Sequence, residues 1–124
     1  MKKILVIEDD KFLKDLLIEQ LKIAGYTVTH TMDCEEGLKK AKDEKPDLIL
    51  LDLVLPGING FEFLKEAKKD SSEIKNIPVL ILSNLGQSDD IKKGIALGAE
   101  DFLIKAHYIL PEIIEKIKET LEKK

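Results

Sequence analysis

Short apolar runs recur along the chain and predict buried β-strands. Lys3–Ile7, Leu48–Leu51 and Val79–Leu82 are each four or five residues long and almost entirely apolar. Continuous runs of this length are typical of parallel strands that are covered on both faces. Tyr26–Thr31 instead alternates polar and apolar residues, which favours a half-exposed edge strand. Phe102–Lys105 is the fifth predicted strand.

The segments between these runs carry apolar residues at helical spacing. Capping and stop residues bound five predicted helices. They are a helix with its apolar face from Leu13 to Ala24 that ends at Gly25, one that begins at Asp33, one capped by Asn59, one that begins near Ser88 or Asp89 and ends before Gly98, and one that begins at Pro111.

This regular alternation of strand and helix predicts the fold class. Strand and helix alternate five times without a low-complexity linker or a repeat, so we predict one domain over residues 1–124. The expected architecture is a doubly wound, three-layer α/β/α sandwich around a five-stranded parallel sheet. In such sheets ligands bind at the carboxyl ends of the strands, where the strand order reverses.

Composition narrows the class of function. The net charge is −4, which disfavours binding to the phosphates of a nucleic acid. All 20 basic residues are lysine, so no guanidinium group is present to hydrogen-bond phosphate or base edges. General nucleic-acid binding is therefore not expected. The single cysteine, Cys34, excludes an internal disulfide and fits the cytoplasm, and we expect no membrane span because no apolar run approaches the length that one needs.

Polar residues of complementary chemistry follow four of the predicted strands. Glu8–Asp10 follow the first strand, Asp52 the third and Ser83-Asn84 the fourth, while Lys105 closes the fifth. The carboxyl ends of parallel strands meet at one edge, so these side chains are expected to gather there. Asp52 stands out because it closes the most apolar segment of the chain, where an unpaired carboxylate is costly.

Gathered carboxylates need a cation. Two carboxylates about 5 Å apart repel by about 3 kcal/mol at an effective dielectric constant near 20. A raised pKa or a hard cation relieves this, and oxygen ligands without histidine or thiolate favour Mg²⁺, or Mn²⁺. A metal ion beside a carboxylate and a lysine provides the nucleophile and the positive charges that phosphoryl transfer needs. Taken singly, a Ser-Asn pair is more often a turn and a lysine at a strand end is more often solvated, and Asp10 can serve as a helix cap. Their occurrence together at the edge where ligands bind favours a functional site.

The sequence resembles the receiver domains of two-component response regulators, especially the single-domain chemotaxis type. The resemblance runs from Ile4 to about Leu121, and it implies a flavodoxin-like sheet with strand order 2-1-3-4-5. The motifs that carry it are Ile7-Glu8-Asp9-Asp10, the segment from Leu51-Asp52 to Asn59-Gly60, Leu82-Ser83-Asn84, and Phe102-Leu103-Ile104-Lys105.

The resemblance implies a role for each matching residue. Asp52 would accept a phosphoryl group from the phosphohistidine of a histidine kinase. Asp9 would bind Mg²⁺ directly, Glu8 through a water molecule, and Val54 through its backbone carbonyl. The remaining roles belong to the switch: Lys105 pairs with Asp52 and then with the phosphoryl group, Ser83 moves to hydrogen-bond it, and Phe102 packs inward afterwards.

The resemblance also implies partners. These are a sensor histidine kinase or phosphotransfer protein and a downstream protein effector, with no direct binding to nucleic acid or membrane. The implied assembly is a monomer or a weak dimer that depends on phosphorylation. The implied activity is confined to the domain's own phosphorylation and dephosphorylation, without turnover of an external substrate. The surface around Ile91 to Phe102 is the expected effector site, and the surplus apolar residues Phe12 and Ile18 are a candidate kinase site.

Some positions depart from the common pattern. Ala106 stands where a proline in a cis peptide is usual, and Asn84 where a small residue is common. Asn84 is therefore a candidate determinant of the lifetime of the phosphoryl group. Serine replaces the frequent threonine at Ser83, and Asn59 stands where the loop often carries aspartate.

Two other classes of protein share the topology or the aspartate. A phosphatase of the haloacid-dehalogenase type needs a second acid two residues after its nucleophile, and here that position is Val54. A flavin-binding module needs a loop that accepts phosphate, but Glu8-Asp9-Asp10 is anionic and contains no glycine. Both alternatives are less well supported than the signalling domain.

Overall fold

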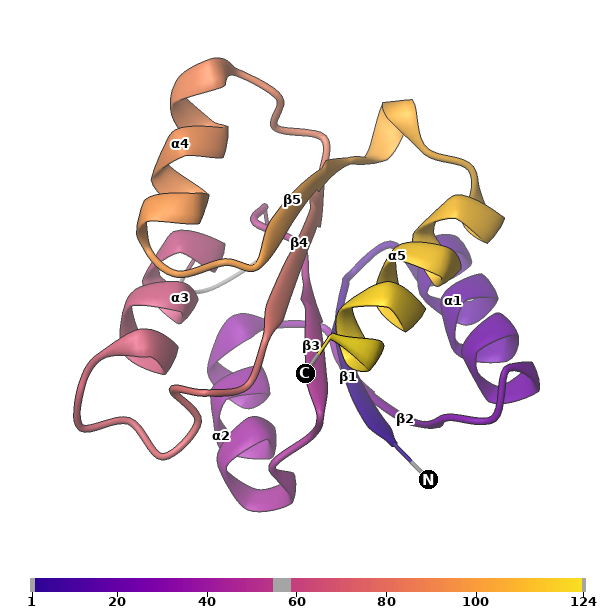
Figure 1. The fold of residues 1–124 in the computed structure, drawn as a ribbon, viewed down its shortest axis with the longest axis horizontal. Helices are drawn as coiled ribbons and strands as arrows, with labels where there is room; N and C mark the ends of the chain where they lie inside the picture. Colours follow the sequence, from indigo (N-terminus) through magenta and orange to yellow (C-terminus); the bar gives the residue numbers. More distant parts are fainter. Residues whose placement is uncertain (1, 55–58, 124) are drawn as a thin grey trace.

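The computed structural model describes residues 2–54 and 59–123. Its sheet contains five parallel strands in the order β2-β1-β3-β4-β5. Figure 1 shows this sheet between two layers of helices. The strands are β1 (Lys3–Ile7), β2 (Thr27–Thr31), β3 (Leu48–Leu51), β4 (Val79–Ser83) and β5 (Asp101–Ile104). The predicted fold class and strand order are confirmed.

Five α-helices and one short 3₁₀ helix connect the strands. They are α1 (Lys11–Ile23), α2 (Cys34–Glu44), α3 (Gly60–Lys68), α4 (Ser88–Ala96), η1 (Lys105–His107) and α5 (Leu110–Glu122). Side-chain oxygens of Asp10, Asp33 and Asn59 accept backbone N–H groups at the first turns of α1, α2 and α3. These caps satisfy donors that the helix itself leaves free.

Five of the predicted boundaries, four of strands and one of a helix, were wrong by one residue. β2 begins at Thr27 instead of Tyr26, and β4 extends to Ser83. β5 begins at Asp101 and ends at Ile104, so Lys105 lies outside the strand in η1. The register explains the earlier start, because Asp101 pairs with Leu80 of β4 although its side chain is polar. The fifth helix begins one residue before Pro111, at Leu110.

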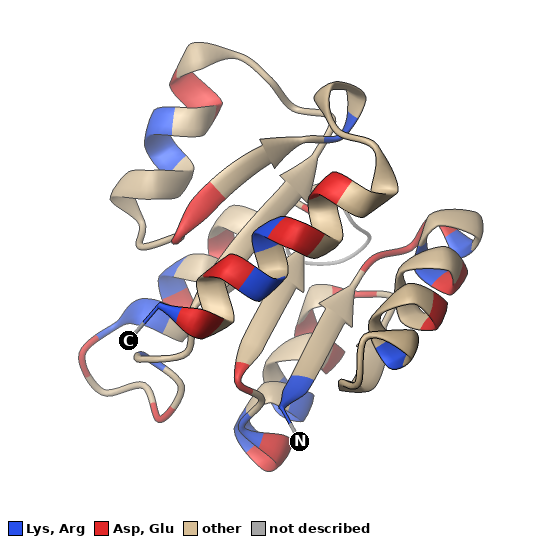
Figure 2. Cartoon of the chain, turned by 45° about the vertical axis from the view of Figure 1, so that its right-hand side comes forward, with Lys and Arg blue, Asp and Glu red and all other residues tan. Residues whose placement is uncertain are grey.

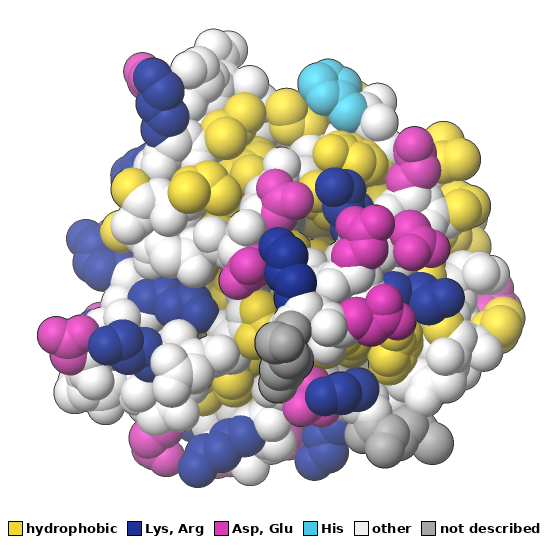
Figure 3. Space-filling model, in the orientation of Figure 1, with side chains coloured by type: hydrophobic (Ala, Val, Ile, Leu, Met, Phe, Trp, Pro, Cys, Tyr) yellow, Lys and Arg dark blue, Asp and Glu magenta, His cyan; other side chains and the backbone are white. Residues whose placement is uncertain are grey.

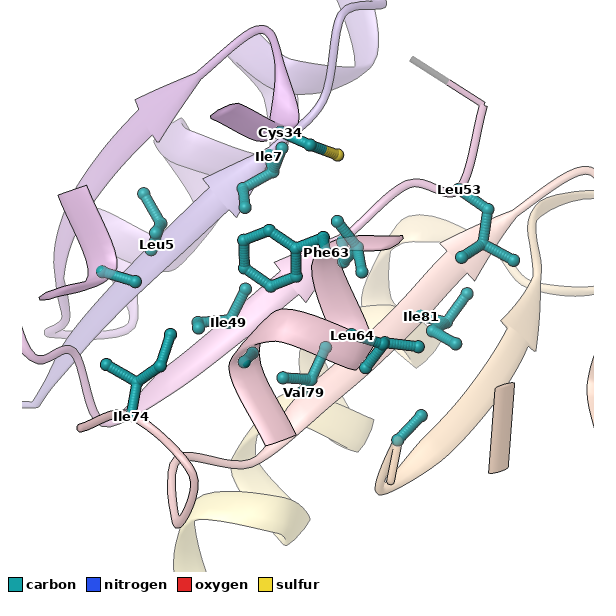
Figure 4. Packing of buried hydrophobic residues seen from close by; sticks show 14 of the residues in the cluster. Leu5, Ile7, Cys34, Ile49, Leu53, Phe63, Leu64, Ile74, Val79 and Ile81 are labelled. Carbon is teal, nitrogen blue, oxygen red and sulfur yellow. The ribbon is translucent and has the colours of Figure 1, made fainter. Parts of the chain in front are cut away.

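The strand residues alternate between two cores. Leu5 and Ile7 of β1 pack on one face of the sheet with residues of α2 and α3, whereas Ile4 and Val6 pack on the other with α1 and α5. Figure 4 shows Phe63 and Leu64 of α3 lying over the strands of the first core. Because both faces are covered, the strands read as continuous apolar runs in the sequence.

Charged residues lie outside these two cores. Figure 2 shows acidic and basic residues along the helices and at the strand ends, with the middle of each strand free of them. The polar residues at the carboxyl ends of the strands are therefore available for a site.

No helix in the described part of the chain is both long and apolar enough to cross a bilayer.

Helix α4 is attached differently from the other helices. Its one buried residue is Gly94, and the N-cap residue Gln87, which precedes the helix, makes no side-chain capping hydrogen bond. An added Cβ at position 94 would lie 2.8 Å from Cδ1 of Ile81 and 3.2 Å from Cδ2 of Phe102. The glycine thus allows the backbone of α4 to approach the sheet closely.

Candidate functional site

Four polar segments meet at the carboxyl edge of the sheet because all five strands are parallel. Residues of these segments line a cleft of about 340 Å³. The lining consists of Glu8, Asp9, Asp10, Asp52, Val54, Asn84, Leu85 and Lys105. Residues 55–58 of the resemblance motif lie outside the described part of the chain. The residues singled out from the sequence that line this cleft are Glu8, Asp9, Asp10, Asp52, Val54, Asn84 and Lys105.

Lys105 is the central cation of the cleft. Its Nζ lies 2.9 Å from Oε1 of Glu8 and 3.1 Å from Oδ2 of Asp52. Burial alone would lower the pKa of this lysine, but the hydrogen bonds and negative charges of the two carboxylates outweigh it and raise the pKa. Lys105 therefore stays protonated at neutral pH and joins the ends of β1 and β3.

Asp52 follows β3 directly and is nearly buried, with 6% of its surface exposed. One carboxylate oxygen accepts the backbone N–H of Val54 at 3.2 Å, and the other accepts Lys105. Both oxygens are therefore oriented by hydrogen bonds. A carboxylate held in this way next to an open cleft has the geometry of a nucleophile.

Glu8 is more constrained than the sequence prediction supposed. Its side chain is buried, and Oε2 accepts the backbone N–H of Asp10 at 3.0 Å while Oε1 accepts Lys105. Burial raises the pKa of Glu8, and the hydrogen bonds from Asp10 and Lys105 oppose that rise. Sequence reasoning missed this ion pair because it depends on the reach of two long side chains across the sheet.

The three acids fit a hard divalent cation. Glu8, Asp9 and Asp52 each offer a carboxylate oxygen, and these atoms lie within 4.8 Å of one another. Asp9 is exposed, and among the described residues its carboxylate has no protein partner, so it is the most available ligand. An all-oxygen set of this kind suits Mg²⁺ or Mn²⁺. Val54 lies at the same cleft, where its carbonyl is a further candidate ligand.

The predicted switch residues lie at different depths. Ser83 is completely buried, and its Oγ accepts the backbone N–H of Leu85 at 3.3 Å. Asn84 is exposed and lines the cleft. Phe102 is already inward, with 8% of its surface exposed, and it packs beneath Gly94 of α4. The burial of Phe102 therefore does not require a phosphoryl group.

The backbone after β5 also differs from the usual pattern. The described residues contain no cis peptide bond, so the bond between Lys105 and Ala106 is trans. The chain turns through η1 at this point, and Nζ of Lys105 still reaches Asp52. The candidate pairing of this lysine with Asp52 is thus compatible with alanine at position 106.

Comparison with known proteins assigns the family. Residues 4–118 match the model of the response regulator receiver domain. The chain belongs to the response regulator receiver family. Receiver domains are signalling domains of two-component systems, and phosphorylation and Mg²⁺ binding are characteristic of them.

Relatives of this receiver domain include transcriptional regulators. The chain is 37% identical to the dual master transcriptional regulator RpaA of Synechocystis over 123 residues, covering 99% of the chain and 50% of the relative. It is 40% identical to the alkaline phosphatase synthesis regulator PhoP of Bacillus subtilis over 104 residues, covering 84% of the chain and 42% of the relative. The chain thus spans about half the length of these curated relatives.

Solved receiver structures agree with the fold. A CheY-like receiver protein from Methanospirillum hungatei superposes with a TM-score of 0.90 at 28% identity, covering 99% of this chain and 95% of that one. This likeness extends over the whole sheet and both helix layers. The resemblance of the strand-end motifs therefore reflects a common receiver architecture.

Proposed function

We propose that this receiver domain accepts a phosphoryl group on Asp52 from the phosphohistidine of a sensor histidine kinase or phosphotransfer protein. The observation that carries this proposal is the position of Asp52, which borders the cleft with Lys105 Nζ 3.1 Å away and two further acids beside it. The transfer breaks the N–P bond of the donor and forms an O–P bond on Asp52. The donor imidazole leaves as the neutral base when its other ring nitrogen carries a proton; otherwise the departing nitrogen takes a proton from solvent.

The residues around Asp52 would offset the negative charge of the phosphoryl group in two ways, through a bound metal ion and through Lys105. Asp9, Asp52 and the Val54 carbonyl would hold Mg²⁺, and Glu8 would assist through its water shell. When bound, the metal offsets negative charge on the phosphoryl oxygens. Lys105 supplies the second positive charge from within the protein, and Glu8 keeps its ammonium in place.

The switch in this proposal begins at Ser83. A phosphoryl group adds about two negative charges and several hydrogen-bond acceptors to Asp52. Ser83 would exchange its contact with the Leu85 N–H for a phosphoryl oxygen, and Phe102 on the neighbouring strand would adjust its packing under α4. Asn84, at the mouth of the cleft, would control the access of water to the phosphoryl group. The changed surface would then bind a protein effector.

Acetyl phosphate with Mg²⁺ tests the acceptor. Intact-protein mass spectrometry is expected to show one added phosphoryl group, and Asp52→Ala is expected to abolish it. Asp43→Ala, which removes an exposed acid far from the cleft, should label like the unaltered chain. Full labelling of Asp52→Ala would refute the assignment, and steady release of product from a generic phosphate ester would favour a phosphatase instead.

A further inference from the structure

A second cleft lies at the opposite edge of the sheet, away from the phosphoacceptor. It has a volume of about 460 Å³, and it lies where the amino ends of the strands meet the ends of α3 and α5. The lining consists of Lys2, Asp47, Lys68, Lys75, Asn76, Pro78, Glu100, Thr120, Leu121 and Lys123. The volume falls within the range that is usual for small-molecule sites.

The charge of this cleft is opposite to that of the whole chain. Four lysines and two carboxylates line it, so the described lining has a formal net charge of +2, whereas the net charge of the chain is −4. The space-filling view shows many lysine atoms over α3 and the segment between α3 and β4 (Figure 3). A cleft with an excess of cations concentrates anions from solution.

Both carboxylates of the lining already have partners. Asp47 accepts the backbone N–H of Lys3 at 2.8 Å, and Glu100 lies 3.7 Å from Nζ of Lys123. Lys75 is paired with Asp70, which does not line the cleft. In the parts of the chain that the structure describes, Lys2 and Lys68 have no carboxylate within 4 Å. Among the described residues, Lys2 and Lys68 are therefore the lysines of the cleft without a carboxylate partner, and Asp47 is its one acid without a lysine partner.

Lys68 gives the cleft a preformed cation. Its Nζ donates to the carbonyls of Lys75 at 3.0 Å and Ile77 at 2.6 Å, which leaves the third N–H of the ammonium without an acceptor among residues 2–54 and 59–123. Its stem passes beside Gly98, where an added Cβ would lie 2.8 Å from Cγ of the lysine. The lysine is thus held by packing and hydrogen bonds before any ligand arrives, which reduces the entropy lost on binding.

From this geometry we propose that the cleft binds a small phosphate-bearing anion, with Lys68 as its central cation and Lys2, Lys75 and Lys123 around it. Because the chain has no arginine, recognition uses point charges together with the side-chain amide of Asn76, and it favours anions with several charges. Burial lowers the pKa of Lys68, and a bound anion would raise it again. This inference does not depend on the assignment of Asp52.

Pyrophosphate is a suitable probe, and NMR titration of the full chain in Mg²⁺-free buffer is the measurement. We expect saturable shifts of the amide signals of Asn76 and Glu100, and an upward shift in the pKa of the Lys68 ammonium. Lys2→Gln should weaken binding about threefold, because it removes one exposed cation of the lining. Lys39→Gln is the matched control, since it removes an exposed lysine on α2 and should change the Kd less than twofold.

Lys68→Met should weaken binding at least tenfold, because it removes the central charge and keeps the stem. If that variant unfolds, the contrast between Lys2→Gln and Lys39→Gln still decides the outcome. Non-saturable shifts, equal effects of these two substitutions, or shifts centred on the Asp52 cleft would overturn the proposal. Orthophosphate and a nucleoside triphosphate, titrated in parallel, distinguish a free phosphate ligand from a larger phosphorylated one.

Discussion

Neutralising Asp9 should make the metal-free protein more stable. In the structure, carboxylate oxygens of Asp9, Glu8 and Asp52 lie within 4.8 Å of one another. Even with the dielectric constant of water, two unit charges at that distance repel by about 0.9 kcal/mol, so Asp9→Asn removes about 1.7 kcal/mol from two pairs. Lys105 attracts Asp9 and offsets part of this sum. We therefore expect a net gain of about 1 kcal/mol in the free energy of unfolding.

Mg²⁺ should reverse this order. A ligand that binds only the folded state stabilises it by RT ln(1 + [L]/Kd), which is about 1.4 kcal/mol at ten times Kd. The unaltered chain should gain this stability, whereas Asp9→Asn has lost its most available metal ligand and should gain little. The two stability curves are thus expected to cross as the Mg²⁺ concentration rises.

Urea unfolding in EDTA and across a Mg²⁺ series measures both effects. With a typical urea m-value of about 1–3 kcal/mol/M, the gain in EDTA shifts the midpoint by about 0.3–1 M. Asp43→Asn is the control, because it neutralises an exposed acid on α2 and should change neither the stability by more than about 0.5 kcal/mol nor its metal dependence. A less stable Asp9→Asn in EDTA, or one that Mg²⁺ stabilises as much as the unaltered chain, would refute the electrostatic reasoning.

Three further predictions concern other parts of the molecule. Lys105→Met should cost about 2–4 kcal/mol of stability near neutral pH, because it leaves two buried carboxylates without their cation. Burial raises the pKa of Glu8, so the loss should shrink as the pH falls and Glu8 takes up a proton; an equal loss at neutral and acid pH in urea unfolding would contradict this. Burial raises the pKa of Cys34 to about 12, so a thiol reagent at mildly alkaline pH should label it only after unfolding, and rapid labelling of the folded protein would be inconsistent with that burial. Gly60→Ala should destabilise the fold by about 2 kcal/mol or more in thermal unfolding, because its Cβ would lie 2.6 Å from a backbone atom of the segment after β3, and an unchanged Tm would show that this segment moves easily.

Most of the fold was predictable because local pattern and tertiary burial agree. The strands Lys3–Ile7 and Leu48–Leu51 are covered on both faces of the sheet, and for this reason their sequences are almost continuous apolar runs. The start of β5 was missed because Asp101 has low strand propensity and enters the ladder only through pairing with β4. Pairing of this kind is a tertiary effect that residue type does not carry.

The sequence was enough to predict which residues gather at the site, but not the hydrogen bonds and ion pairs that connect them. Parallel strands bring Asp52 and Lys105 to one edge, and this follows from topology alone. The bond from Lys105 to Glu8 depends on a glutamate long enough to reach across the cleft and on η1, which turns the lysine back over the sheet. The inward position of Phe102 likewise depends on Gly94, because the missing side chain leaves room for the phenylalanine ring beneath α4.

The sparse anchoring of α4 has a consequence for motion. Every other α-helix buries at least two residues with side chains, whereas α4 buries only a glycine and begins without a side-chain cap. Helices with few buried contacts open at a low free-energy cost, and an interior glycine lowers that cost further. Amide protons of α4 should therefore exchange with solvent through local openings much smaller than global unfolding. The helix that covers Phe102 is thus the one that the domain can rearrange without loosening its core.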